Sequence, residues 1–161
     1  MSGTVLFICT GNTCRSPMAE RLVRHALQAE RAPLNQLQVK SAGISADHGY
    51  KASANSVAAL KKVGIDLNDH QTTHLTESLL QEADYIFGMT QGHLDSMSYV
   101  LRDSTDNRFH LMRGFLGAEN DLEIPDPFGR GFSDYEFTRD SMVEAIPSLI
   151  EFLKSQYSYS K

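Results

Sequence analysis

The sequence predicts an α/β fold, a three-layer sandwich in which a four-stranded parallel sheet carries helices on both faces. Four short apolar runs alternate along the chain with longer stretches whose apolar residues recur at helical spacing, and this alternation is typical of parallel sheets. The 161 residues contain no internal repeat, low-complexity tract or long linker, so residues 1–161 are expected to form a single domain. In such sheets a functional site is expected where the strands end, near the switch in strand order.

The first strand and helix are predicted at the N-terminus. Residues 4–9 (TVLFIC) are apolar or β-branched throughout, which predicts a strand buried on both faces. A turn-rich TGNT follows, and then a helical pattern in which Ser16 is expected at the N-cap and Pro17 at the first helical position. The apolar face of this helix is formed by Met18, Leu22, Val23, Ala26 and Leu27.

The middle of the chain repeats the alternation. Strands are predicted at 37–42, 84–89 and 108–112. Ser53 is expected to cap one helix and Thr76 to open another, shorter one. The apolar residues at helical spacing in this part are Val57, Leu60, Val63, Leu94, Met97 and Leu101.

The C-terminal part combines a long loop with a long helix. Residues 114–132 are rich in Gly and Pro, and loops of this length tend to be functional. The pattern Ser133-x-x-Glu136 predicts a capping box at the start of the last helix. Pro147 lies inside that helix and is expected to kink or interrupt it. The apolar face is formed by Met142, Ala145, Ile146, Leu149, Ile150 and Leu153.

Composition narrows the class of protein. The net charge of −5 argues against a nucleic-acid binder that acts by broad phosphate neutralisation, although it leaves room for one local anion site. No apolar run reaches the ~18 residues of a membrane span, and the run at 4–9 is too short for a signal peptide. With two cysteines and no export signal, we expect a reduced, cytoplasmic protein that is monomeric and does not act at a membrane.

The loop CTGNTCRS after the first strand has the composition of a phosphate-binding loop. Gly11 and Asn12 tolerate left-handed backbone conformations, so backbone N–H groups can converge ahead of a helix N-terminus. Arg15 adds a fork of donors that suits phosphate oxygens. Cysteines in such surroundings have pKa values of roughly 3.5–7.5 instead of about 8.5, so Cys9 is a candidate nucleophile, with Ser16 donating to its sulfur. The alternative is that Cys9 is merely a small buried strand residue.

The other cysteine and an acidic residue complete the set of candidates. Cys14 is either a small filler residue or a redox partner that forms a disulfide with Cys9 and shields it from overoxidation. A zinc site is not expected, because the C-x(4)-C pair has no second pair of ligands. Asp126 lies between Pro125 and Pro127, and such a stiff, exposed carboxylate suits a general acid. The alternative is an ordinary turn residue.

Together these motifs resemble the low molecular weight protein tyrosine phosphatase family. The matching segments are FICTGNTCRSPMAE, KSAG, GIDLNDH, ADYIFGMT and DPFG. The resemblance implies the fold of that family and hydrolysis of phosphorylated protein side chains through a phosphocysteine intermediate, with inorganic phosphate as product and no metal or organic cofactor. It makes Cys9 the nucleophile, Arg15 the ligand of the phosphoryl oxygens, and Asp126 the acid that protonates the leaving group and then activates water.

The resemblance also implies the roles of the surrounding residues. The backbone N–H groups from Thr10 to Arg15 complete the phosphate-binding loop, which includes Thr10, Gly11, Asn12, Thr13 and Cys14. Ser16 would stabilise the thiolate of Cys9. Asn12, supported by Ser41 and His70, would hold the loop in its strained shape.

Two positions resemble the bacterial protein arginine phosphatase branch of the family. Thr13 stands where tyrosine-specific members usually carry an aliphatic residue, and Phe128-Gly129 stands where they usually place two aromatic residues. A phosphoguanidinium is planar and cationic, so Thr13 would supply a polar wall, Asp126 a charge partner and Phe128 one stacking wall. Phosphoarginine is therefore the expected substrate, with phosphotyrosine or a broad specificity as the alternative.

Two other functions compete. An arsenate reductase on the same scaffold would need further cysteines to relay a disulfide, and the chain has none beyond Cys9 and Cys14. A phosphate-binding module without activity would lack the nucleophile or the acid, whereas Cys9 and Asp126 are both present.

Overall fold

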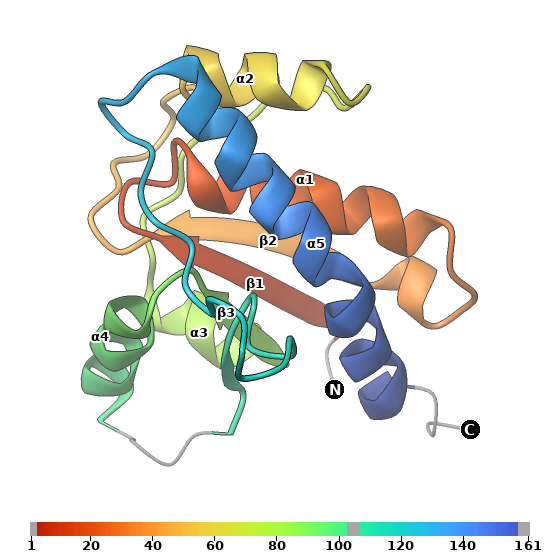
Figure 1. Cartoon of the computed structure of the whole chain (residues 1–161). Helices are drawn as coiled ribbons and strands as arrows, with labels where there is room; N and C mark the ends of the chain where they lie inside the picture. Colours follow the sequence, from red (N-terminus) through yellow and green to blue (C-terminus); the bar gives the residue numbers. More distant parts are fainter. Residues whose placement is uncertain (1–2, 103–106, 158–161) are drawn as a thin grey trace.

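The structure, a computed structural model that describes residues 3–102 and 107–157, is built on one parallel sheet. The strands lie in the order β2-β1-β3-β4. Figure 1 shows α1, α2 and α5 on one side of this sheet and α3 and α4 on the other. The α/β class, the four parallel strands and the three layers predicted from the sequence are therefore confirmed.

The strands and helices alternate along the chain. The strands are β1 (Thr4–Cys9), β2 (Gln38–Gly43), β3 (Tyr85–Gly88) and β4 (Phe109–Leu111). The helices are α1 (Arg15–Gln28), α2 (Ala54–Lys61), α3 (Glu77–Glu82), α4 (Gln91–Leu101) and α5 (Phe132–Tyr157), with a short 3₁₀ turn at Leu34–Gln36.

Strand β1 lies in the interior of the sheet and is buried on both faces, as its unbroken apolar run predicts. Because side chains alternate along a strand, Phe7 and Cys9 belong to the cluster that packs under α1 and α5. Leu6 and Ile8 belong to the cluster that packs under α3 and α4. The chain leaves β1 for β2 on one side and later adds β3 on the other, so the loop after Cys9 lies at the switch in strand order.

The start of α1 differs from the prediction. The helix begins at Arg15 with Cys14 at the N-cap, so Ser16 is not the cap and Pro17 is the third helical residue. The hydroxyl of Ser16 is instead engaged by the side chains of Cys9 and Asn12. Pro17 still lies in the first turn, where a backbone N–H has no partner within the helix.

The start of α5 also differs from the prediction. The helix begins at Phe132, so Ser133 lies inside its first turn and the capping box with Glu136 is not formed. The turn at Gly131 sets the start instead, since its carbonyl accepts a hydrogen bond from the backbone N–H of Asp134 at 3.0 Å. The carboxylate of Glu136 pairs with Lys62 at 3.1 Å.

Two further residues behave differently from the prediction. Pro147 does not interrupt α5, which continues to Tyr157. The carbonyl that Pro147 leaves without a donor belongs to Val143, and both residues lie on the exposed side of the helix, where water can replace the lost bond. Val63 is exposed, because α2 ends at Lys61 and Val63 falls in the turn after it.

None of the helices described is long and apolar enough to cross a membrane.

Candidate functional site

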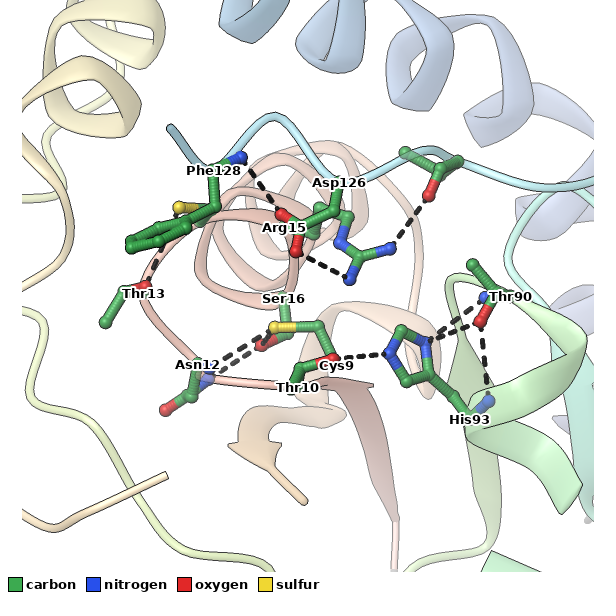
Figure 2. A network of polar contacts seen from close by, with 12 residues as sticks. Cys9, Thr10, Asn12, Thr13, Arg15, Ser16, Thr90, His93, Asp126 and Phe128 are labelled. Carbon is green, nitrogen blue, oxygen red and sulfur yellow. Dashed lines mark hydrogen bonds and ion pairs between the residues drawn. The ribbon is translucent and has the colours of Figure 1, made fainter. Parts of the chain in front are cut away.

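A pocket of about 200 Å³ lies where β1 ends. Residues from two distant parts of the chain line it, namely Cys9, Thr10, Gly11, Thr13, Cys14, Arg15, Asp126 and Phe128. Figure 2 shows this site from close by, with the loop before α1 on one side and the segment around Asp126 above it. The structure therefore brings the predicted nucleophile, arginine and acid into one pocket.

The sulfur of Cys9 lies at the base of this loop among hydrogen-bond donors. Its Sγ is 2.9 Å from Oγ of Ser16 and accepts a hydrogen bond from the backbone N–H of Asn12 at 3.3 Å. The N-terminus of α1 follows at Arg15 and adds a partial positive charge. The loop thus directs a backbone N–H and a hydroxyl to the sulfur of Cys9.

Asn12 holds the loop in a left-handed conformation, with φ of 56°. Its Nδ2 donates to Oγ of Ser16 at 2.8 Å and to Oγ of Ser41 at 3.0 Å. Its Oδ1 accepts from the backbone N–H of Thr73 at 2.9 Å. The carbonyl of Asn12 is 2.8 Å from Nε2 of His70, which must therefore carry the proton. The structure thus places Ser41 and His70 behind the loop and not in the pocket.

Buried hydrogen bonds hold the residues behind the loop in place. Desolvation lowers the pKa of His70, despite its hydrogen bond to the carbonyl of Asn12. The hydroxyl of Ser41 donates to the buried carboxylate of Glu20 at 3.1 Å, and Glu20 is paired with Arg21 at 2.8 Å. Each polar group behind the loop therefore has a partner, which keeps the backbone geometry in place.

Arg15 joins the two halves of the site. Its guanidinium is buried and donates through Nη1 to the carbonyl of Ile124 at 2.9 Å. Its Nη2 lies 3.6 Å from Oδ2 of Asp126. The first contact orients the fork of donors, and the second directs the carboxylate of Asp126 over the same pocket as the sulfur of Cys9.

The segment around Asp126 is much more exposed. The side chain of Asp126 is 50 % exposed, and its Oδ1 accepts from the backbone N–H of Phe128 at 3.1 Å. Phe128 is 72 % exposed although it lines the pocket. Gly129 has φ of 77°, a left-handed turn that suits glycine. Asp126 thus makes one hydrogen bond within its own turn and one ion pair, with Arg15.

The sulfur of Cys14 has a different environment from that of Cys9. It lies 3.4 Å from the hydroxyl of Tyr135 on α5 and 3.5 Å from Oγ of Ser53. Burial, and then the contact with Cys14, raises the pKa of Tyr135 to about 12. Both cysteines are free thiols in this structure. The disulfide between Cys9 and Cys14 stays a prediction.

One residue at the site was not foreseen from the sequence. His93, in the first turn of α4, is buried, and its Nε2 lies 3.1 Å from Oγ1 of Thr10. Burial, together with the positive charge of Arg15, lowers the pKa of His93 to about 4. The available signal was Thr90-x-x-His93 directly after the third strand. Across residues 3–102 and 107–157, no group of three or more potential metal ligands occurs.

Comparisons with known proteins agree with this geometry. A family model described as low molecular weight phosphotyrosine protein phosphatase matches residues 4–159. A protein-arginine-phosphatase of Bacillus subtilis is 39 % identical, over 93 % of this chain and 96 % of its own. A probable low molecular weight protein-tyrosine-phosphatase, EpsP of Ralstonia solanacearum, is 34 % identical, over 84 % and 86 %. The structure of the YwlE arginine phosphatase from Geobacillus stearothermophilus superposes with a TM-score of 0.83 at 31 % identity, over 98 % and 97 %.

Proposed function

The chain belongs to the low molecular weight phosphotyrosine protein phosphatase family, and we propose that it hydrolyses phosphorylated protein side chains through a phosphocysteine on Cys9, with phosphoarginine preferred. One observation carries the proposal. The sulfur of Cys9, held by Ser16 and the N–H of Asn12, opens into the same pocket as the ion pair between Arg15 and Asp126. A nucleophile, an anion ligand and a proton donor thus meet at one point.

In the first step the thiolate of Cys9 attacks phosphorus. The S–P bond forms while the bond from phosphorus to the leaving oxygen or nitrogen breaks, and Asp126 gives its proton to that leaving atom. The guanidinium of Arg15 and the converging N–H groups of the loop stabilise the charge on the three phosphoryl oxygens. The contact of Arg15 with the carbonyl of Ile124 keeps the guanidinium oriented during this step.

In the second step a water molecule attacks the phosphorus of the phosphocysteine on Cys9. The carboxylate of Asp126, now without its proton, accepts one from the water that attacks phosphorus. The S–P bond breaks, inorganic phosphate leaves and the thiolate of Cys9 is restored, stabilised by Ser16 and the N–H of Asn12. The two steps balance in atoms and electrons, so one catalytic cycle consumes only the phosphorylated substrate and water.

Three pocket residues support the preference for phosphoarginine. Thr13 lines the pocket, and its hydroxyl, 3.6 Å from Sγ of Cys14, makes this side of the pocket more polar than an aliphatic residue would. Phe128 offers one aromatic face, and the residue after it is Gly129, which offers none. The side chain of Asp126 can pair with a cationic guanidinium in addition to acting as the general acid. The similarity to the Bacillus subtilis protein-arginine-phosphatase points the same way.

The class of reaction is tested with a chromogenic aryl phosphate. We expect hydrolysis that survives a metal chelator and disappears in Cys9→Ser, because serine at this position lacks a thiolate. Circular dichroism of the variant should match the wild-type protein. Absence of hydrolysis by the folded wild-type protein, or full activity of Cys9→Ser, would overturn the proposal.

The substrate preference is tested with matched peptides. Release of phosphate from phosphoarginine and phosphotyrosine versions of one peptide should favour phosphoarginine in the wild-type protein. Thr13→Ile should shift the ratio of the two kcat/KM values toward phosphotyrosine, and Thr13→Ser, which keeps the hydroxyl, should not. An unchanged ratio in Thr13→Ile would show that Thr13 does not determine the substrate preference.

A further inference from the structure

The contact between His93 and Thr10 links α4 to the phosphate-binding loop. The Nε2 of His93 and the Oγ1 of Thr10 are 3.1 Å apart, although the residues are 83 positions apart in the sequence. Figure 2 shows the imidazole lying between Thr90 on one side and Thr10 on the other. Capping of α4 uses only Nδ1 of this ring, so the contact through Nε2 is not needed for the cap.

The hydrogen bonds of His93 determine which ring nitrogen carries the proton. The backbone N–H of Thr90 points at Nδ1 at 3.2 Å, and a backbone N–H can only donate. Nδ1 is therefore an acceptor, and the proton of the neutral ring lies on Nε2. The depressed pKa of His93 keeps the ring neutral at physiological pH. The charged groups that act on it are Arg15, Asp126 and Glu123.

This tautomer determines the direction of the hydroxyl of Thr10. The Nε2–H of His93 donates to Oγ1, so Thr10 accepts there and its own proton must point elsewhere. Thr10 is exposed and lines the pocket beside Cys9. Within the described residues, no other hydrogen bond of Oγ1 of Thr10 is recorded. An unprotonated phosphoryl oxygen can only accept a hydrogen bond, so a hydroxyl helps to bind it solely when its proton faces the pocket.

We propose that His93 is a positioning residue that turns the Thr10 hydroxyl into a hydrogen-bond donor to the phosphoryl group in the pocket. The inference rests on the proposed function, because it assigns an additional ligand to the same phosphate site. Without His93 the hydroxyl is free to rotate and to present a lone pair to the phosphoryl oxygens. The histidine thus acts on the ligand only through Thr10.

Binding of inorganic phosphate, measured by titration calorimetry, tests the inference without any turnover. Thr10→Val, which keeps the shape and removes the hydroxyl, should weaken binding about tenfold, as expected for one hydrogen bond to a charged acceptor. His93→Leu should weaken it by a similar factor. His93→Gln keeps an acceptor for the N–H of Thr90 and an amide donor for Thr10, and should restore binding to within about threefold. His25→Leu, on the exposed side of α1, is the matched control.

The double variant separates positioning from a merely structural role. If His93 acts through Thr10, adding His93→Leu to Thr10→Val should cause no further loss of phosphate binding. A further tenfold loss, or wild-type affinity in Thr10→Val, would overturn the inference. A wild-type protein that binds phosphate but hydrolyses no phosphorylated substrate would instead overturn the proposed function and leave this test valid.

Nuclear magnetic resonance of the wild-type protein provides a check that needs no variant. The ¹⁵N shifts of the His93 imidazole at pH 7 should show a neutral ring with its proton on Nε2. A proton on Nδ1, or a charged ring at this pH, would contradict the hydrogen-bond pattern from which the inference starts.

Discussion

The two loops that form the pocket are built in opposite ways. The loop from Cys9 to Ser16 is held from behind by buried hydrogen bonds, with Asn12 fully buried and bonded through its side chain, N–H and carbonyl. The loop that carries Asp126 is anchored at Ile124, which is buried and bonded to Arg15 and to the backbone of Met89. Beyond that anchor, Asp126 and Phe128 are exposed.

This difference separates stability from activity. Changes in the first loop disturb buried partners, so they should lower the free energy of unfolding together with the reaction rate. Changes in the second loop should affect the reaction rate alone. An exposed acid segment is also free to adjust to substrates of different size, whereas the nucleophile and its donors stay in place.

The largest effect is expected at the exposed acid. Asp126→Asn should lower kcat by about 10²–10⁴, the usual contribution of a general acid, while the melting temperature stays near that of the wild-type protein. The loss should be smaller for an aryl phosphate whose leaving group needs no proton. A melting temperature that falls along with kcat would show that Asp126 belongs to the rigid part of the site.

A smaller effect, on stability as well as rate, is expected within the rigid loop. Asn12→Ala removes buried hydrogen bonds and places alanine at φ of 56°, so it should lower the free energy of unfolding by about 2–4 kcal/mol. Asn12→Gly loses the same hydrogen bonds, but glycine tolerates the left-handed backbone. Its free energy of unfolding should therefore be about 1 kcal/mol higher than that of Asn12→Ala. Urea denaturation measures both; equal losses would show that strain contributes nothing.

Phe128 should contribute to binding and very little to folding. Its ring is exposed, so Phe128→Ala should change the free energy of unfolding by less than about 0.5 kcal/mol. The KM for a phosphorylated peptide should rise several-fold, since one stacking surface is lost, while inorganic phosphate should inhibit as before. Weaker inhibition by phosphate would place Phe128 nearer the phosphoryl group than the geometry indicates.

The two buried histidines should make stability depend on pH. The pKa values of His70 and His93 are lowered in the folded protein because both rings are buried. The unfolded chain therefore binds more protons below about pH 6.5, and the free energy of unfolding should fall as the pH drops from there toward 4. Denaturation at several pH values should give a shallower slope for His93→Gln. An equal slope would show that His93 does not titrate in this range.

The sequence predicts those parts of the molecule that depend on local pattern. The apolar run ending at Cys9, the caps at Ser53 and Thr76 and the Gly- and Pro-rich loop all appear where local propensity places them. Ser16 and Ser133 show the limit of local pattern. Each has the residue type of a cap, yet Ser16 bonds to Cys9 and Asn12, and a turn at Gly131 starts α5 one residue before Ser133.

The contact between His93 and Thr10 shows a second limit. The local pattern Thr90-x-x-His93 indicates a helix cap and says nothing of a contact with Thr10. Its importance comes from the sheet, which places β3 beside β1 and so brings the start of α4 next to the loop after Cys9. Such a pair is visible only once the strand order is known.

Cys9 is the residue that we propose carries the phosphoryl group between the two steps. Rapid mixing of Asp126→Asn with a phosphorylated aryl substrate, followed by acid quench and mass spectrometry, tests this directly, because the missing base slows hydrolysis of the intermediate. We expect one added phosphoryl group, located on Cys9 by peptide mapping and absent when Cys9 is also changed to alanine. A phosphoryl group on any other residue, or none during turnover, would contradict the account.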